Sequence, residues 1–392
     1  MITYLLTIVL FIKLFLEGMG YPIFIDEVVN LEAGANFLSS FSYSNTFGNY
    51  TQSFDPFITT GPLATLIGGL PLVLGFPVLY SRVLFLLVSL SLLIFLLNKI
   101  ARFHNFKFYQ VLTLSGILLG CWSEVALYFS IMWGEVFGSL ILVAGVLHYQ
   151  QGKLRSAFLL FSSAAILVKT IFVLPVLGYF LLLLLKNIPL KNKINIILLS
   201  MTPLGFVLVN IFFDRGLAGV LQYPFDVMAA FSQNGSGLNS EMNQVSISLV
   251  LENVKIVYSN TGIGIFLLSC ITLIFGIRSW REKSFDDLTP LFLSFLFYFL
   301  WFFMKGRAEL TRHLAPMIFC CWYISLIPML KILNKKENYL RPLLIGLFFI
   351  LYVPSIQRDR GIILDDLKET RFIDHSIVDK NSRSILKEMF DD

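Results

Sequence analysis

The stretch PVLYSRVLFLLVSLSLLIFLL, residues 77–97, is the clearest indication of the fold class. It has about the 20 residues that an α-helix needs to cross the hydrocarbon core of a bilayer. Only one of its side chains, that of Arg82, is charged. A run of this length and apolarity predicts a membrane-spanning helix.

Apolar runs of the same kind recur along the chain. The others cover residues 2–19, 109–127, 133–149, 156–170, 171–186, 194–213, 261–277, 288–304, 314–331 and 341–355. We therefore predict an all-α polytopic membrane protein with about 11 transmembrane helices. The two runs that meet near Lys169 are short, which predicts helices that end inside the protein.

The composition excludes a soluble globular enzyme. Of the 392 residues, 56% are hydrophobic and 14% are charged, and the mean hydropathy is +0.77, whereas ordinary soluble domains carry roughly 25% charged residues. The net charge of +5 comes from short basic clusters between apolar runs. Such clusters indicate membrane topology and not a nucleic-acid partner.

The basic clusters orient the chain. Short connections rich in Lys and Arg stay on the cytoplasmic side, and the segment 21–77 contains neither residue. We expect the N-terminus in the cytoplasm, and segment 21–77 and the C-terminus outside. The composition, rich in Lys, Asn, Ile and Phe, and the lack of a eukaryotic retention signal favour a bacterial inner membrane. The first apolar run lacks a small-residue cleavage site and is expected to remain as an anchor.

This topology predicts four regions. Residues 1–213 form a transmembrane core whose first outer loop, 21–77, is helical in part. Residues 214–260 form a second outer loop that is rich in Gly, Ser and Asn near its middle, and we interpret it as a mobile lid. Residues 261–355 form the C-terminal transmembrane helices, and residues 356–392 form an outer tail.

Two adjacent carboxylates, Asp26 and Glu27, follow the first apolar run at the expected outer boundary. A carboxylate in a partly dehydrated setting can act as a general base toward an acceptor hydroxyl or amine. Alternatively, Asp26 simply caps the helix that follows it. The residue pattern leaves both interpretations open.

Several cationic side chains fall on the same expected side of the membrane. Fixed cations at this depth suit a lipid phosphate, although a single cation is more often a snorkelling or paired charge. The candidates for phosphate binding are Arg82, Lys169, Arg307, Arg312 and His313, next to Lys305. Glu135, at the outer start of a helix, is either a helix-capping carboxylate or a further acidic group of the site.

Other familiar signals are missing from the sequence. It has no glycine-rich phosphate loop, no HExxH and no Cys/His cluster, so no cofactor is predicted, although its carboxylates are compatible with a divalent metal. The four cysteines, Cys121, Cys270, Cys320 and Cys321, lie in apolar runs. We expect no disulfide framework.

The order of these motifs resembles the glycosyltransferase C superfamily, in its polyprenyl-phosphate-sugar branch with the protein O-mannosyltransferases and the lipid A aminoarabinose transferases. The similarity covers roughly residues 1–330. The residues that carry it are Ile25-Asp26-Glu27, Gly61-Pro62-Leu63, Leu74-Gly75-Phe76, Tyr80-Ser81-Arg82, Trp133-Gly134-Glu135, Lys169-Thr170, Leu174-Pro175 and Thr311-Arg312-His313-Leu314-Ala315-Pro316. His313 stands where the family often has Tyr, and Lys169 where Arg is common.

The resemblance implies a function in cell-envelope glycan biosynthesis. It implies transfer of a sugar from a polyprenyl-phosphate carrier, such as undecaprenyl phosphate, to a glycan, lipid or protein on the outer side, with inversion. Asp26 matches the general base and Glu27 its supporting neighbour, while Arg82, Lys169 and Arg312 match positions near the phosphate. A transporter or flippase for a lipid-linked or anionic substrate is the alternative, since many helices with charges at membrane depth also suit transport.

Overall fold

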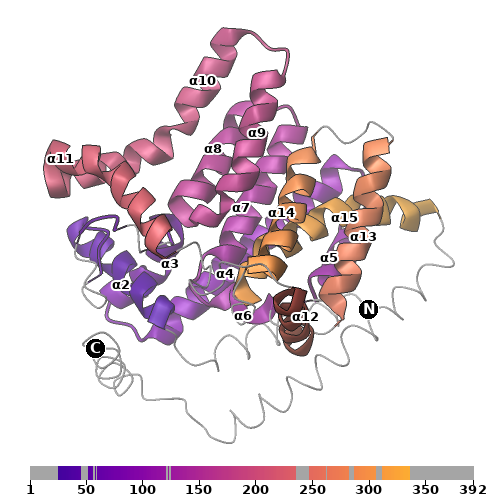
Figure 1. Ribbon diagram of the computed structural model, residues 1–392, viewed down its shortest axis with the longest axis horizontal. Helices are drawn as coiled ribbons and strands as arrows, with labels where there is room; N and C mark the ends of the chain where they lie inside the picture. Colours follow the sequence, from indigo (N-terminus) through magenta and orange to yellow (C-terminus); the bar gives the residue numbers. More distant parts are fainter. Residues whose placement is uncertain are drawn as a thin grey trace, which may run out of the picture.

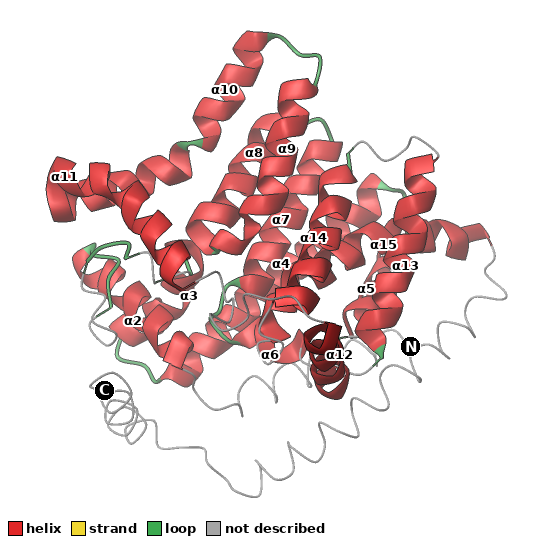
Figure 2. Ribbon diagram, viewed as in Figure 1, coloured by secondary structure: helices red, strands yellow, loops and turns green. Residues whose placement is uncertain are grey.

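The structure, a computed structural model, describes residues 25–45, 52–55, 58, 60–120, 122, 125–234, 247–261, 263–281, 287–305 and 311–335. Within these residues the chain is helical, and no strand is present (Figure 2). The predicted helices at 2–19 and 341–355 and the tail 356–392 lie outside the described residues. The all-α prediction is confirmed for the part of the chain that is described.

The N-terminal half forms α2 to α9. Its helices are α2 (Ile25–Ser40), α3 (Pro62–Val73), α4 (Val78–Phe103), α5 (Phe108–Gly120), α6 (Val125–Ser130), α7 (Glu135–Gln150), α8 (Leu154–Ser162) and α9 (Val173–Leu185). A π-helical turn, Ser163–Val168, and a 3-10 turn, Thr170–Phe172, separate α8 from α9. The two short runs that meet near Lys169 therefore do end within the fold, as predicted.

The C-terminal half forms α10 to α15. Its helices are α10 (Leu190–Ser200), α11 (Thr202–Asn234), α12 (Ile247–Thr261), α13 (Gly264–Arg281), α14 (Thr289–Lys305) and α15 (Ala315–Lys335), with a 3-10 turn, η4 (Thr311–Leu314), ahead of α15. Figure 1 shows α10 and α11 extending from the body of the bundle on the side where α2 and α3 lie.

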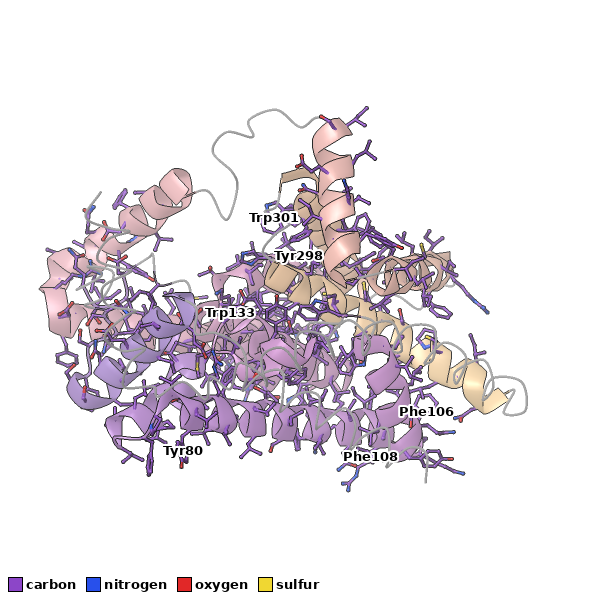
Figure 3. All side chains as sticks on the ribbon, turned by 90° about the horizontal axis from the view of Figure 1, so that it is seen from below. Tyr80, Phe106, Phe108, Trp133, Tyr298 and Trp301 are labelled. Atoms are coloured by element: carbon purple, nitrogen blue, oxygen red, sulfur yellow. The ribbon has the colours of Figure 1, made fainter. Side chains whose placement is uncertain are left out.

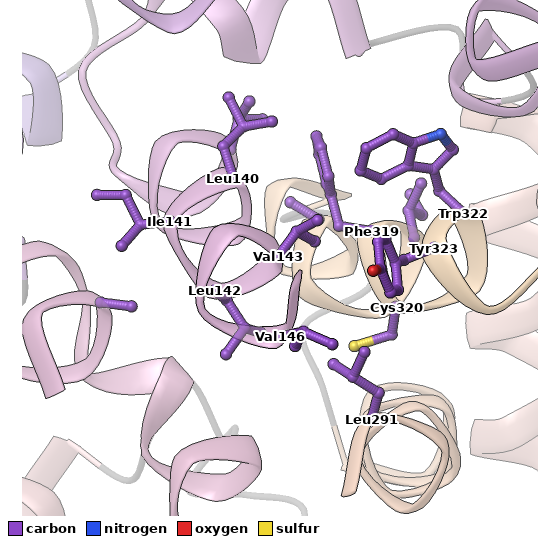
Figure 4. Packing of buried hydrophobic residues seen from close by; sticks show 14 of the residues in the cluster. Leu140, Ile141, Leu142, Val143, Val146, Leu291, Phe319, Cys320, Trp322 and Tyr323 are labelled. Carbon is purple, nitrogen blue, oxygen red and sulfur yellow. The ribbon is translucent and has the colours of Figure 1, made fainter. Parts of the chain in front are cut away.

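The core is centred on α7 and α15. Every α7 residue from Glu135 to Leu147 is buried, as expected for a helix that is apolar on all faces. Figure 4 shows Leu140 and Val143 of α7 close to Phe319 and Trp322 of α15. These two helices form the rigid interior against which the other helices pack.

Some element boundaries differ from the sequence predictions. The segment 214–260, predicted as a second outer loop, is helical at both ends, because α11 continues to Asn234 and α12 begins at Ile247. Its place relative to the membrane stays a prediction. The run 194–213 is divided between α10 and α11 at Met201, and the run 109–127 contains the end of α5 and the start of α6. The helix α3 escaped prediction, although Pro62 in its first turn suits a helix start.

The length of the helices supports an integral membrane protein. Among the described residues, three helices are long and apolar enough to cross a membrane: Val78–Phe103, Thr202–Ala229 and Ala315–Ile332. Seven shorter apolar helices accompany them. The exact number of membrane spans stays a prediction.

Aromatic side chains are divided between the interior and the periphery. Figure 3 shows Trp133 inside the molecule, whereas Tyr80 and Phe108 lie at its edge. Trp133 is 6% exposed and Tyr80 is 53% exposed. Exposed aromatic and aliphatic side chains of this kind suit contact with lipid.

Candidate active site

A buried ion pair joins the start of α2 to α4. Arg82 Nε donates to Glu27 Oε1 at 2.8 Å, and Arg82 Nη2 donates to Glu27 Oε2 at 2.5 Å. Glu27 is fully buried and Arg82 nearly so. This two-point contact uses the planar guanidinium as a matched partner for a carboxylate. It fixes the first turn of α2, which also carries Asp26, against α4.

Lys169 stands in a break between helices. The π-helical turn ends at Val168, and the backbone of Lys169 is extended, with φ −159° and ψ 130°. Lys169 forms an isolated antiparallel bridge with Thr60, and the Gly61 amide donates to Val168 O at 2.7 Å. The break exposes backbone groups inside the fold, and the segment that leads into α3 satisfies them.

The ammonium group of Lys169 has three oxygen partners. Its Nζ lies 3.3 Å from Glu135 Oε1, and it donates to Thr60 Oγ1 at 2.9 Å and to Trp133 O at 3.0 Å. Lys169 is 8% exposed and Glu135 is 1% exposed. A charge this deep is stable only when it is paired and hydrogen-bonded, which these contacts provide.

His313 approaches the same carboxylate from a distant part of the chain. His313 Nδ1 lies 3.7 Å from Glu135 Oε1, and His313 sits in η4 immediately before α15. Glu135 is the first residue of α7, where the helix dipole favours a negative charge. Three separate elements thus place a carboxylate, an ammonium group and an imidazole side by side.

The loop 131–134 links the two ion pairs. Asn30, three residues after Glu27 on α2, donates to Met132 O at 2.7 Å, while Trp133 O accepts from Lys169. Gly134 then takes the left-handed conformation, with φ +81°, which glycine adopts without strain. This turn starts α7 directly at Glu135. The acidic start of α2 and the Lys169 cluster therefore belong to one connected region.

The structure brings five of the predicted site residues together, two in one ion pair and three in one cluster. Glu27 pairs with Arg82, and Glu135 lies with Lys169 and His313. Asp26 is the second residue of α2, and Arg312 lies in η4, but the described part of the chain does not include their side chains. Arg307 lies outside the described residues, and Lys305 ends α14. The assigned roles of all these residues stay predictions.

Other residues of this region escaped the sequence analysis. Tyr43 OH donates to Thr60 O, Thr65 Oγ1 donates to Tyr43 OH at 3.2 Å, and Thr60 Oγ1 donates to Trp133 O at 3.2 Å. Burial raises the pKa of the Tyr43 phenol, so it stays protonated and able to donate. In the sequence, Thr60 and Thr65 stand near Gly61-Pro62, and this pattern predicts a turn but no binding or catalytic role.

Metal and disulfide predictions can be compared only with the described residues. In that part of the chain, no three His, Cys, Asp or Glu side chains lie together as a metal-binding group. Cys270, Cys320 and Cys321 are free thiols, and Cys121 lies outside the described residues.

Comparison with known proteins shows similarity at the level of structure. No protein-family model matches the sequence, and no curated protein matches it either. The fold is similar to the crystal structure of ArnT from Cupriavidus metallidurans bound to undecaprenyl phosphate, with a TM-score of 0.51 and 12% identity. The match covers 83% of this chain and 59% of ArnT, so the chain spans about three fifths of that protein's length.

The similarity shows that this chain shares a polytopic helical fold with ArnT, in agreement with the resemblance noted in the sequence.

Proposed function

We propose that the protein is a membrane glycosyltransferase that uses a polyprenyl-phosphate-linked sugar and acts on the outer side of the membrane. The observation that carries the proposal is the convergence of Glu135, Lys169 and His313 beside the loop that also fastens α2. The similarity in fold to ArnT, which was crystallised with undecaprenyl phosphate, supports a donor of this class.

The chemistry requires one base and a set of cations. The acceptor oxygen or nitrogen forms a bond to the anomeric carbon while the bond from that carbon to the phosphate oxygen breaks. The phosphate leaves with the bonding electrons, and the acceptor proton passes to a carboxylate. Attack on the face opposite the leaving phosphate inverts the configuration at the anomeric carbon.

We assign the base to Asp26, in the first turn of α2. The Glu27–Arg82 pair holds that turn against α4, which supports a fixed position for the neighbouring carboxylate. Lys169 and His313 are the cations that we place near the leaving phosphate, where fixed positive charge stabilises the developing negative charge. Arg307 and Arg312 complete the proposed set. The contacts of Arg82 favour its role in holding Glu27 over direct phosphate binding.

The proposal is tested with the purified full chain in lipid nanodiscs. Given a radiolabelled undecaprenyl-phosphate sugar, the protein is expected to transfer or slowly hydrolyse the sugar, and Asp26→Asn is expected to abolish release of undecaprenyl phosphate. Glu32→Gln, on the same helix, is the matched control and is expected to retain activity. Full activity of Asp26→Asn would remove the assigned base. Transport of the donor without cleavage would favour the flippase alternative.

A further inference from the structure

The first half of α11 presents polar side chains to the segment that follows α2. Asn210, Asp214 and Arg215 lie just before Gly216, where α11 is kinked, with φ 66° and ψ −167°. Their neighbours Phe212 and Phe213 are exposed. A polar side in a helix that is otherwise suited to lipid requires polar partners.

The partners of α11 lie in two described stretches after α2, residues 41–45 and residues 52–54, which we call the held segment. Asn210 Nδ2 donates to Phe41 O at 2.7 Å, and Asn210 Oδ1 accepts from Ser53 Oγ. The Ser53 amide donates to Asp214 Oδ2 at 2.8 Å, and Arg215 Nη2 donates to Ser53 O at 3.2 Å. These contacts hold the two ends of the segment to one helix.

Both held ends contain strained backbone. Phe41 has φ 58° and Phe54 has φ 57°. These values lie in the left-handed region, which residues other than glycine rarely adopt. Phe41 supplies the carbonyl that Asn210 binds, and Phe54 directly follows Ser53. Strain of this kind persists only where surrounding contacts stabilise it, and α11 supplies several of them.

The held segment leads to the Lys169 cluster. The Phe54 amide donates to Tyr43 O at 2.8 Å, and the two rings pack with centroids 4.8 Å apart. Tyr43 OH donates to Thr60 O, and Thr60 Oγ1 accepts from Lys169 Nζ at 2.9 Å. A continuous chain of contacts therefore runs from α11 to the ammonium group proposed to face the donor phosphate.

We propose that Asn210 and Asp214 are positioning residues. Through Phe41, Ser53 and Phe54, and then through Tyr43, they fix Thr60, and so they fix Lys169 for the phosphate of the lipid-linked donor. This inference rests on the proposed function. Neither residue needs to touch the substrate, since each acts through the segment that it holds.

The test combines hydrogen exchange with kinetics on the full chain in nanodiscs. Asp214→Leu removes the acceptor of the Ser53 amide, whereas Asp214→Asn keeps an oxygen there. Asn210→Leu removes the bonds to Phe41 and Ser53. Thr202→Val is the matched control, because the Thr202 hydroxyl, at the start of α11, donates to Leu199 O.

Asp214→Leu and Asn210→Leu are expected to speed exchange of the Ser53 and Phe54 amides about tenfold, as loss of one or two hydrogen bonds to a locally opening segment predicts. Exchange of the Gly61 amide, bonded to Val168 O, is expected to rise with it. The KM for undecaprenyl-phosphate sugar is expected to rise about fivefold with kcat within about twofold, the pattern of a binding defect. Asp214→Asn and Thr202→Val are expected to resemble the wild type.

Several results would overturn the inference. Unchanged exchange at Ser53 in Asp214→Leu would show that α11 does not hold the segment. Faster exchange at Ser53 with unchanged exchange at Gly61, or with an unchanged KM, would show that the segment does not position the Lys169 cluster. If the wild type transfers no sugar while Ser53 and Gly61 respond together, the proposed function fails and the positioning role of α11 remains.

Discussion

The two buried ion pairs of the candidate site differ in how they are built. The Glu27–Arg82 pair is a two-point contact between two helices, with bonds of 2.8 and 2.5 Å. The Lys169 cluster is looser: its ammonium group lies 3.3 Å from Glu135 and divides its bonds between a hydroxyl and a backbone carbonyl. It also receives a second basic group, His313, at 3.7 Å.

This difference suggests different roles. A matched pair of planar groups costs much to separate and suits a structural lock for α2. A lysine at a break between helices has three rotatable donors and can exchange one oxygen partner for another. From this comparison we propose that Arg82 holds α2 in place and that Lys169 is the group that responds to a bound anion.

The largest expected effect is the loss of the lock. Arg82→Ala leaves the Glu27 carboxylate buried beside α4 with its two-point partner removed, which is expected to cost about 3–5 kcal/mol. The free energy of unfolding is measured by denaturant titration in detergent micelles. The double variant Glu27→Gln/Arg82→Met is the control and is expected to lose less. A double variant less stable than Arg82→Ala would contradict the account of a lock.

Loss of Lys169 is expected to have a smaller effect on folding and a larger one on ligand binding. Lys169→Met removes charge-assisted bonds worth about 1.5–3 kcal/mol. Because it also removes the proposed partner of the phosphate, we expect the Kd for undecaprenyl phosphate to rise at least about tenfold. Binding is measured by thermal shift in nanodiscs. Equal binding by Lys169→Met and the wild type would reverse the two roles.

The turn between the pairs provides a third test. Gly134→Ala forces a side chain onto a residue with φ +81°, and its Cβ would lie 3.1 Å from Thr60 Cγ2 and 3.2 Å from Val168 O. We expect a loss of about 1–3 kcal/mol in unfolding free energy from strain and crowding.

Gly75 is the matched control for this turn. It has the same φ of +81°, but a Cβ there meets nothing within 4 Å. Gly75→Ala is expected to incur only the backbone cost of about 1–2 kcal/mol. Equal losses in the two variants, measured by the same denaturant titration, would show that close packing around Gly134 contributes nothing.

The smallest expected effect is on the pH dependence of stability, and it comes from His104, at the end of α4 opposite to Arg82. Burial, followed by the positive charge of Lys331, lowers the pKa of His104 from 6.5 to about 4. The folded state thus disfavours the protonated form, so stability is full above pH 6.5 and decreases as the pH falls from about 6.5 towards 4.

The measurement is the melting temperature as a function of pH. His104→Gln is expected to flatten the curve between pH 6.5 and 4, and any slope that remains reports other titrating groups. An unchanged slope in His104→Gln would show that His104 makes no contribution. This correction is needed before a pH effect is attributed to the His313–Glu135 contact.

Sequence patterns predicted much of the fold because a membrane-spanning helix is recognisable from a single continuous apolar run. The apolar run 77–97 became part of α4, and the charged interruption at Lys169 marked a real break between helices. The helix α11 continues past the end of the apolar run 194–213, through Asp214 and Arg215. Their polarity is instead satisfied by Ser53, a partner far away in the sequence.

The candidate site was only partly predictable for the same reason. Charged residues such as Glu135 and Lys169 stand out in an apolar sequence, since their burial is costly unless they are paired. Which carboxylate meets which cation was not visible, and neither was the contribution of Thr60 or Tyr43. Uncharged polar residues in a turn are common, so their presence alone carries little information.

Hydropathy and charge are properties of single residues, so the amino-acid pattern was enough to predict a helical membrane protein whose few charged residues lie mostly at the ends of apolar runs. The pairing of Glu27 with Arg82, and of Glu135 with Lys169 and His313, became visible in the folded chain alone. Such pairing depends on distances between segments far apart in the chain, and those distances are set by how the helices pack.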